Sequence, residues 1–140
     1  MIKELAEYED MIEEVVATED ILKEWIFQKK TAKVILGEFD GQIVGYCLYF
    51  YNFSTFLGRA GIYLEDLYVR PQYRKKGFGD AFLKNLAKIA VNEGLGRIDW
   101  ACLDWNKPSI DFYLSKNATQ LSDWTCYRLE GKPLKDLAND

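Results

Sequence analysis

Residues 63–79 read YLEDLYVRPQYRKKGFG, and this stretch decides the fold. The aliphatic and aromatic residues of 62–69 predict a strand, which ends at Pro71 because proline cannot donate to a strand ladder. The segment Arg74–Gly79 then leads into a helix, which the spacing of the apolar residues predicts over 78–93. The stretch therefore predicts a strand, a glycine-containing loop and a helix in direct succession.

The loop between this strand and this helix has the composition of an anion-binding site. Gly77 and Gly79 allow a tight turn and a close approach of a ligand to the backbone amides. The N-terminus of the following helix offers unpaired N–H groups and the positive end of the helix dipole, which together bind phosphate or pyrophosphate. Positive charge is added by Arg74, Lys75 and Lys76. A plain tight turn is the alternative, because the loop is neither a P-loop nor a complete G-x-G-x-x-G fingerprint.

The strand itself carries two adjacent acids, Glu65 and Asp66. Successive side chains of a strand point to opposite faces, so one acid faces a covered side unless a β-bulge redirects it. Burial raises the pKa of a carboxyl group, which suits a general base. An ion pair with a neighbouring cation is the alternative.

A third chemical segment opens at Lys107-Pro108, where proline favours the first turn of a short helix. Asn106 and Ser109 are hydrogen-bonding residues at the start of this helix, and Tyr113 on it is a candidate proton donor. Helix capping and packing are the alternative roles for this segment.

The rest of the chain alternates between helical and extended patterns. The first helix begins at the first residue, Thr18 caps a second helix, and Asp40-Gly41 is a hairpin turn. The remaining expected elements are strands at 34–36, 43–53, 97–103 and 124–129, a loop at 54–58, and a polar tail at 133–140 with a helical turn as its alternative. This order predicts one mixed α/β domain over residues 1–140, built around a single sheet.

The composition excludes several classes of function. Histidine is absent, which rules out Ser-His-Asp and Cys-His catalysis and histidine-ligated metals, and we expect no metal. The cysteines are three and widely spaced, so they predict neither a disulfide framework nor a zinc site. The net charge of −4 argues against a nucleic-acid partner. Neither a membrane-spanning run nor a signal peptide pattern is present, so we expect a cytoplasmic protein without a membrane partner.

These segments together resemble a known family. The run Arg74–Gly79 is similar to the R/Q-x-x-G-x-G/A acetyl-CoA motif of the GNAT N-acetyltransferase superfamily. The stretches 63–66, 104–106 and 112–113 resemble its spermidine/spermine and thialysine branch, and the similarity extends over nearly the whole chain. The resemblance implies a mostly antiparallel central sheet flanked by helices, and a homodimer. It also implies that the usual first strand is missing, because Met1 falls within the first helix.

The resemblance further implies a role for each matching residue. The loop would bind the pyrophosphate of acetyl-CoA through Arg74, Lys75, Lys76, Gly77, Phe78 and Gly79. The strand backbone at Leu67 and Val69 would pair with the pantetheine arm, and Asn106 and Ser109 would contact CoA. Glu65 would accept the proton of the amine, and Tyr113 would protonate the leaving thiolate. The cationic amine would be held by Glu13, Phe56, Glu65 and Asp66.

The loop Ser54-Thr55-Phe56 bears on the choice of amine, because it lacks the acid that polyamine enzymes carry there. The expected substrate is therefore a small cationic amine, either thialysine- or lysine-like or a diamine. The expected reaction is direct attack of its primary amine on acetyl-CoA. The alternatives are a polyamine acetyltransferase, a protein or peptide N-acetyltransferase, and a CoA-binding regulatory module without catalysis.

Overall fold

A computed structural model describes residues 1–140 and divides the chain into two compact units, Met1–Leu103 and Asp104–Asp140. The first unit contains α1 (Ile2–Tyr8), α2 (Glu19–Lys23), β1 (Lys33–Phe39), β2 (Gln42–Ser54), β3 (Arg59–Val69), α3 (Phe78–Asn92) and β4 (Ile98–Trp100). Short irregular helices lie at Ile12–Glu14, Glu24–Gln28 and Pro71–Tyr73. The second unit contains α4 (Lys107–Leu114) and α5 (Gly131–Asn139). No helix is both long enough and apolar enough to cross a membrane.

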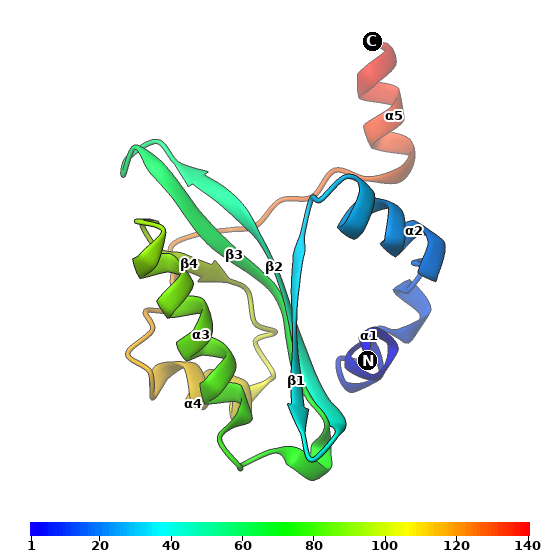
Figure 1. Ribbon diagram of the computed structural model, residues 1–140. Coiled ribbons are helices and arrows are strands. Elements are labelled where there is room, and N and C mark those ends of the chain that lie inside the picture. The colour runs from blue at the N-terminus through cyan, green and yellow to red at the C-terminus, as the bar shows by residue number, and fades with distance from the viewer. The chain divides into compact units, whose positions relative to one another are not determined.

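The first unit is built around one four-stranded sheet in the order β1-β2-β3-β4. Neighbouring strands are antiparallel except for β3 and β4, which are parallel. Figure 1 shows α3 on one face of this sheet and α1 with α2 on the other. The predicted hairpin turn is confirmed, because Asp40 and Gly41 both adopt positive φ between paired Phe39 and Gln42.

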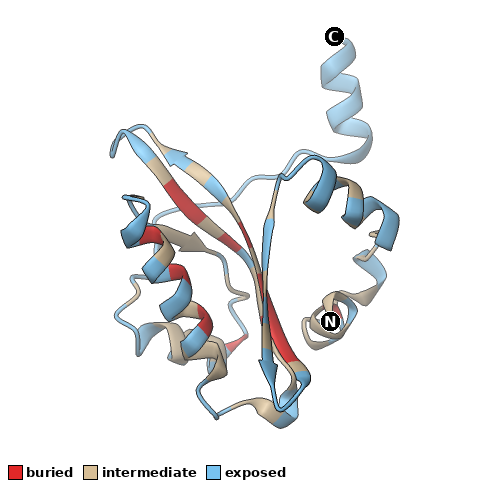
Figure 2. Cartoon of the chain, in the orientation of Figure 1, coloured by how far each residue is buried: buried red, intermediate tan, exposed pale blue.

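The core of the first unit lies between α3 and the sheet (Figure 2). The helix spans 78–92, close to the predicted 78–93, and buries Phe82, Leu86 and Ala90 at helical spacing. These side chains pack against four buried residues of the middle strands, Cys47, Tyr49, Ile62 and Leu64. The predicted mixed α/β fold, with a mostly antiparallel sheet flanked by helices, is therefore confirmed.

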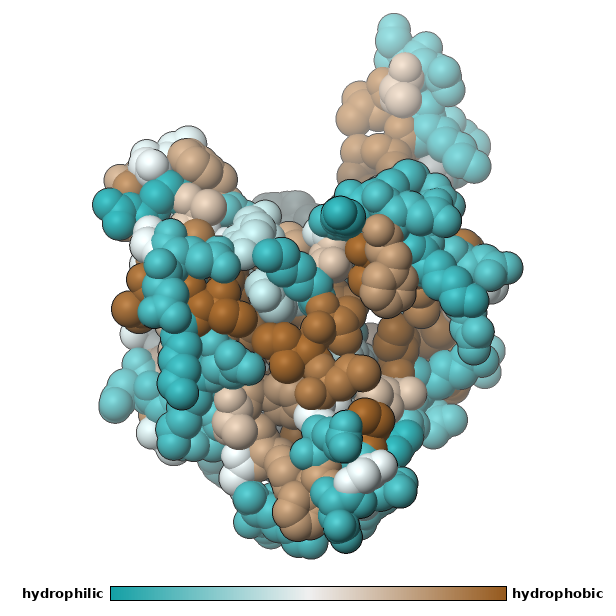
Figure 3. All heavy atoms as spheres, in the orientation of Figure 1, coloured by the Kyte–Doolittle hydropathy of each residue, from teal (hydrophilic) through white to brown (hydrophobic).

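The outer edge of the sheet is formed by β1, and no strand precedes β1 in the chain. This agrees with the expectation that the usual first strand is missing. Val34, Leu36 and Phe39 are exposed along this edge, where hydrophobic atoms are visible at the surface (Figure 3).

Two predicted strands need correction, and the helical alternative holds for the polar tail, which is the helix α5. The strand expected at 97–103 is confined to Ile98–Trp100. The strand expected at 124–129 is absent: the segment has no regular structure, and Trp124 and Tyr127 are 77% and 94% exposed. Aromatic residues favour a strand only where a neighbouring strand pairs with them, and this segment has no such partner within the chain.

Candidate active site

A β-bulge in β3 determines where the two adjacent acids point. Leu48 of β2 lies opposite Asp66, whereas the next residue, Tyr49, lies opposite Leu64, so Glu65 is the extra residue of the bulge. Before the bulge, Leu64 faces α3 as part of the core. After it, Leu67 packs against the same core, so Asp66 is turned to the α1 face instead. The sequence left open whether a bulge redirects one acid, and the structure shows that it does.

Asp66 is the more buried of the two acids, and it is held by a tyrosine. The hydroxyl of the buried Tyr46 donates to Oδ2 of Asp66 at 2.9 Å. Burial raises the pKa of Asp66, and the hydrogen bond from Tyr46 offsets part of this rise. Glu65, by contrast, is exposed. Of the two acids, Asp66 therefore fits the buried carboxyl that the sequence suggested.

A third acid joins this pair from α1. Burial raises the pKa of Glu9, and the nearby negative charges of Asp66 and Glu65 raise it further. Glu9 is therefore close enough to Asp66 and Glu65 for their negative charges to act on it, and acids gathered in this way attract a cation. The sequence singled out Glu13 instead, which is exposed in the short helix Ile12–Glu14.

The position of Glu9 had a detectable signal in the sequence. Glu9 follows Leu5 by four residues and Ile2 by seven, so it continues the apolar face of the first helix. An acid in line with an apolar helical stripe is unusual, because burying a charge is costly. That position should have marked Glu9 as a candidate.

The anion loop has the geometry that its composition predicted. Lys75 and Gly77 adopt positive φ, and α3 begins directly afterwards at Phe78. The backbone amides of residues 75–79 donate to no other backbone group, so they are available to an anion. No atom lies within 4 Å of the position of a Cβ on Gly77, so the turn is open to a ligand. The residues present therefore fit a pyrophosphate.

The side chains of this loop are arranged differently from its amides. Lys75 and Lys76 are exposed. Phe78 packs edge-on against Phe39 of β1, with ring centroids 5.6 Å apart, and thereby anchors the start of α3. Arg74 turns back towards β3, where its Nε donates to the carbonyl oxygen of Val69 at 2.7 Å.

The edge of β3 beside this loop can accept an extended ligand. β4 pairs with β3 only over Ile62–Leu64, so the later part of this edge, from Leu67 to Val69, has no strand partner on that side. Unpaired backbone groups of an edge are a template for pairing with another extended chain. The predicted backbone contacts of Leu67 and Val69 with a pantetheine arm need such an edge.

Three predicted residues belong to the second unit. Asn106 is buried and caps α4, because its Oδ1 accepts a hydrogen bond from the amide of Ser109 at 3.4 Å. Tyr113 lies on α4 beside Phe112, with ring centroids 5.4 Å apart. The capping role is thus confirmed, and the roles of these three residues towards CoA remain predictions.

Phe56 lies apart from the acids. It is fully exposed at the tip of the β2–β3 hairpin. Asp66 pairs with Leu48, six residues before Ser54 at the end of β2, which places the tip about 20 Å along the strand. The structure therefore does not bring Phe56 together with Glu65 and Asp66, and its role in binding the amine remains a prediction.

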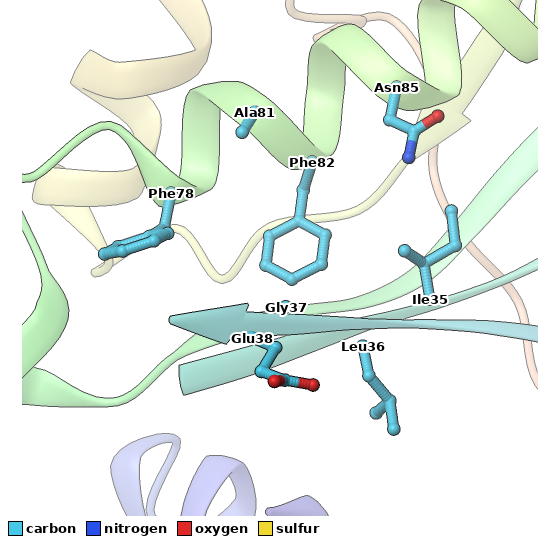
Figure 4. A pocket seen from close by; sticks show the side chains of 8 residues that line it. All are labelled: Ile35, Leu36, Gly37, Glu38, Phe78, Ala81, Phe82 and Asn85. Carbon is cyan, nitrogen blue, oxygen red and sulfur yellow. The ribbon is translucent and has the colours of Figure 1, made fainter. Parts of the chain in front are cut away.

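A separate pocket of about 280 Å³ lies between β1 and α3 (Figure 4). Its lining is mainly apolar and consists of Ile35, Leu36, Gly37, Glu38, Phe78, Ala81, Phe82 and Asn85. Phe78 is the only predicted site residue among them, and none of the three acids is present. The pocket is therefore distinct from the acid cluster. Neither these three acids nor any other group of three or more Cys, Asp or Glu residues is arranged so that it could hold a metal ion.

Comparison with known proteins agrees with this geometry. Residues 2–117 match the sequence profile of the Acetyltransferase (GNAT) family. The chain is 39% identical to the thialysine N-epsilon-acetyltransferase of Bos taurus over 150 aligned positions, which cover 99% of this chain and 88% of that protein. It is 41% identical to an L-ornithine N5-acetyltransferase of Arabidopsis thaliana over 98 positions, covering 70% of this chain and 43% of the relative.

Solved structures show the same fold. An integron cassette protein from the mobile metagenome of V. cholerae superposes with a TM-score of 0.81 at 29% identity, covering 98% of this chain and 86% of that one. An aminoglycoside acetyltransferase from a soil metagenome superposes with a TM-score of 0.77 at 17% identity, covering 92% of this chain and 86% of that one.

Proposed function

The chain belongs to the GNAT acetyltransferase family, and we propose that it transfers the acetyl group of acetyl-CoA to a primary amine of a small cationic substrate. The observation that carries the choice of substrate is the nearness of Glu9 to Asp66 and Glu65, with Asp66 held on the α1 face by Tyr46. Three negative groups beside an open strand edge favour an acceptor with more than one positive charge. Thialysine, lysine-like amines and short diamines have this property, and relatives are named thialysine N-epsilon-acetyltransferases.

The donor side is assigned to the loop and to the edge of β3. Acetyl-CoA supplies an activated thioester when bound. The free amides of residues 75–79 would bind its pyrophosphate, with Lys75 and Lys76 adding charge. Leu67 and Val69 would hold the pantetheine arm through the unpaired edge of β3, where a backbone amide would also stabilise negative charge on the carbonyl oxygen of the thioester. Asn106 and Ser109 are also proposed to contact CoA.

The acceptor side must deliver a neutral amine. Deprotonating an alkylammonium of pKa near 10.4 at pH 7 costs about 4.6 kcal/mol. Glu65 is the proposed base, because it is the exposed acid of the bulge and lies next to the unpaired edge. Asp66 and Glu9 hold the second positive charge of the substrate, and Tyr113 is the proposed acid for the thiolate.

The proposal is tested by measuring CoA release from acetyl-CoA with thialysine, lysine, ornithine, short diamines, spermidine, spermine and peptides as acceptors. The expected result is turnover with the short amines at a kcat/KM about tenfold to a hundredfold above that for spermine. A distant ammonium of spermine would find no acid in the loop Ser54-Thr55-Phe56, and one such charge-assisted contact contributes about 1.5–3 kcal/mol. Faster acetylation of spermine would support a polyamine enzyme instead. Binding of CoA without turnover of any amine would support a regulatory module.

The proposal extends to assembly and location. Residues 1–140 are proposed to form a single GNAT domain. The protein is proposed to be cytoplasmic. A homodimer is proposed because Trp124 and Tyr127 are largely exposed, which suits packing across an interface. Light scattering at micromolar concentration should give the mass of a dimer, and a monomer mass would contradict this part of the proposal.

A further inference from the structure

Arg74 is the first residue of the anion loop, but its side chain turns away from the loop and contacts β3 and α1. Its Nε donates to the carbonyl oxygen of Val69 at 2.7 Å. Its guanidinium carbon lies 4.8 Å from the ring centre of Tyr8 and 5.5 Å from that of Tyr68. Both distances are within the range of a cation–π contact. One side chain therefore joins the start of the loop, the end of β3 and helix α1.

The contact with Tyr8 bears directly on the acid cluster, because Tyr8 is the last residue of α1 and Glu9 follows it. A second arginine holds the same helix: Nε and Nη2 of Arg70 donate to the two carboxylate oxygens of Glu4 at 3.1 and 3.2 Å. Glu4 and Tyr8 are four residues apart and thus share one face of α1. The C-terminal end of α1 is the end that Arg74 holds.

We propose that Arg74 is a positioning residue that couples the acetyl-CoA loop to the amine site, by holding Tyr8 so that the adjacent Glu9 stays beside Asp66. The proposal rests on the proposed function, since it assigns the two sides of Arg74 to the two substrates. It differs from a role as a phosphate ligand, in which the positive charge of Arg74 alone matters. In this proposal, binding of CoA restricts the motion of the loop. Because Arg74 contacts Tyr8, the motion of α1 is restricted as well.

The two roles predict different kinetics. For Arg74→Gln, the positioning role predicts a rise of about three- to tenfold in the KM for the amine at saturating acetyl-CoA, with kcat changed by less than about twofold. Arg74→Lys should show a similar rise, because lysine keeps the charge but lacks the planar fork that bonds Val69 and stacks on the rings. A phosphate ligand would instead be rescued by lysine, and its loss would raise only the KM for acetyl-CoA.

A double-mutant cycle with Tyr8 isolates the contact. Tyr8→Leu removes the ring and should raise the KM for the amine as Arg74→Gln does, and the double variant should be no worse than either single one. Tyr8→Phe keeps the aromatic ring, so its KM for the amine should stay close to the wild-type value. Lys88→Gln, on the exposed face of α3, controls for the loss of a positive charge. Additive effects of the two substitutions, or rescue by Arg74→Lys, would overturn the proposal.

Hydrogen exchange tests the coupling without turnover. On addition of CoA to the wild type, the amides of residues 5–11 should exchange more slowly, and in Arg74→Gln this slowing should be lost although CoA still binds by calorimetry. Equal slowing in both proteins would refute the coupling. If the wild type binds CoA and shows the slowing but acetylates no amine, the proposed function fails while the coupling stands.

Discussion

Replacing Tyr46 by phenylalanine removes the hydroxyl group that bonds Asp66, and we expect this to lower the stability of the protein in a pH-dependent way. The hydroxyl of Tyr46 donates to Asp66 at 2.9 Å on the α1 face, where Tyr46 is buried and Asp66 is partly buried. A hydrogen bond to a charged, partly buried group contributes about 1.5–3 kcal/mol. We therefore expect Tyr46→Phe to lower the free energy of unfolding by about this amount at pH 7.

The pH dependence follows from the direction of the pKa shift. Burial raises the pKa of Asp66 above its unfolded value, so Asp66 favours folding below the unfolded pKa, and this contribution is lost as the pH rises through the folded pKa. The hydrogen bond from Tyr46 opposes that loss, because it stabilises the ionised form. The cost of Tyr46→Phe should therefore be largest at neutral pH and shrink in acid, where Asp66 is protonated.

Urea unfolding followed by tryptophan fluorescence between pH 4 and pH 8 measures this cost. In the Asp66→Asn background, Tyr46→Phe should cost only about 0.5–1.5 kcal/mol, since the remaining bond is neutral. Tyr127→Phe is the matched control, because that hydroxyl belongs to a 94% exposed residue. A cost that is independent of pH and unchanged by Asp66→Asn would refute the reasoning.

Five further substitutions test the fold and the site. Gly45→Ala should destabilise the protein by about 3 kcal/mol or more in urea unfolding, because a Cβ there would clash with the backbone carbonyl oxygen of Tyr68. Gly37→Ala should cost less, because its Cβ would meet the side-chain ring of Phe82 at 2.8 Å and not backbone. Glu65→Gln should lower kcat/KM most at neutral pH and recover in part at high pH, whereas a wild-type pH–rate profile would exclude Glu65 as the base. Glu9→Gln should raise the KM for the amine about tenfold without changing the affinity for CoA measured by calorimetry. A bulky residue at Gly79 should weaken CoA binding far more than amine binding.

The sequence predicted the local elements of this fold well, because each depends on nearby residues. Asp40-Gly41 forms the expected turn, and Thr18 accepts the expected hydrogen bond from the amide of Ile21 at 3.3 Å. The anion loop is likewise a local feature, in which Gly77 and the start of α3 follow each other directly.

Features that depend on distant partners were harder to predict. The segment 124–129 has the residue types of a strand but pairs with none in the chain. The bulge at Glu65 was foreseen only as one of two outcomes, because the register between β2 and β3 is set by the packing of both strands. The contacts of Arg74 were missed entirely, since its neighbours Tyr8 and Tyr68 come from separate parts of the sequence.

The acid cluster opposes folding and favours binding for the same physical reason. Burial raises the pKa of both Glu9 and Asp66, so each carboxylate is less stable in the folded protein than in water when it is ionised. A bound ammonium would offset the repulsion between these carboxylates, so its binding free energy adds to the stability of the folded state. The ion pair of Arg70 with Glu4 and the contacts of Arg74 fasten α1 at this face. Without these contacts of α1, the repulsion between the carboxylates would move Glu9 away from Asp66. The two acids would then no longer lie together to bind a cation.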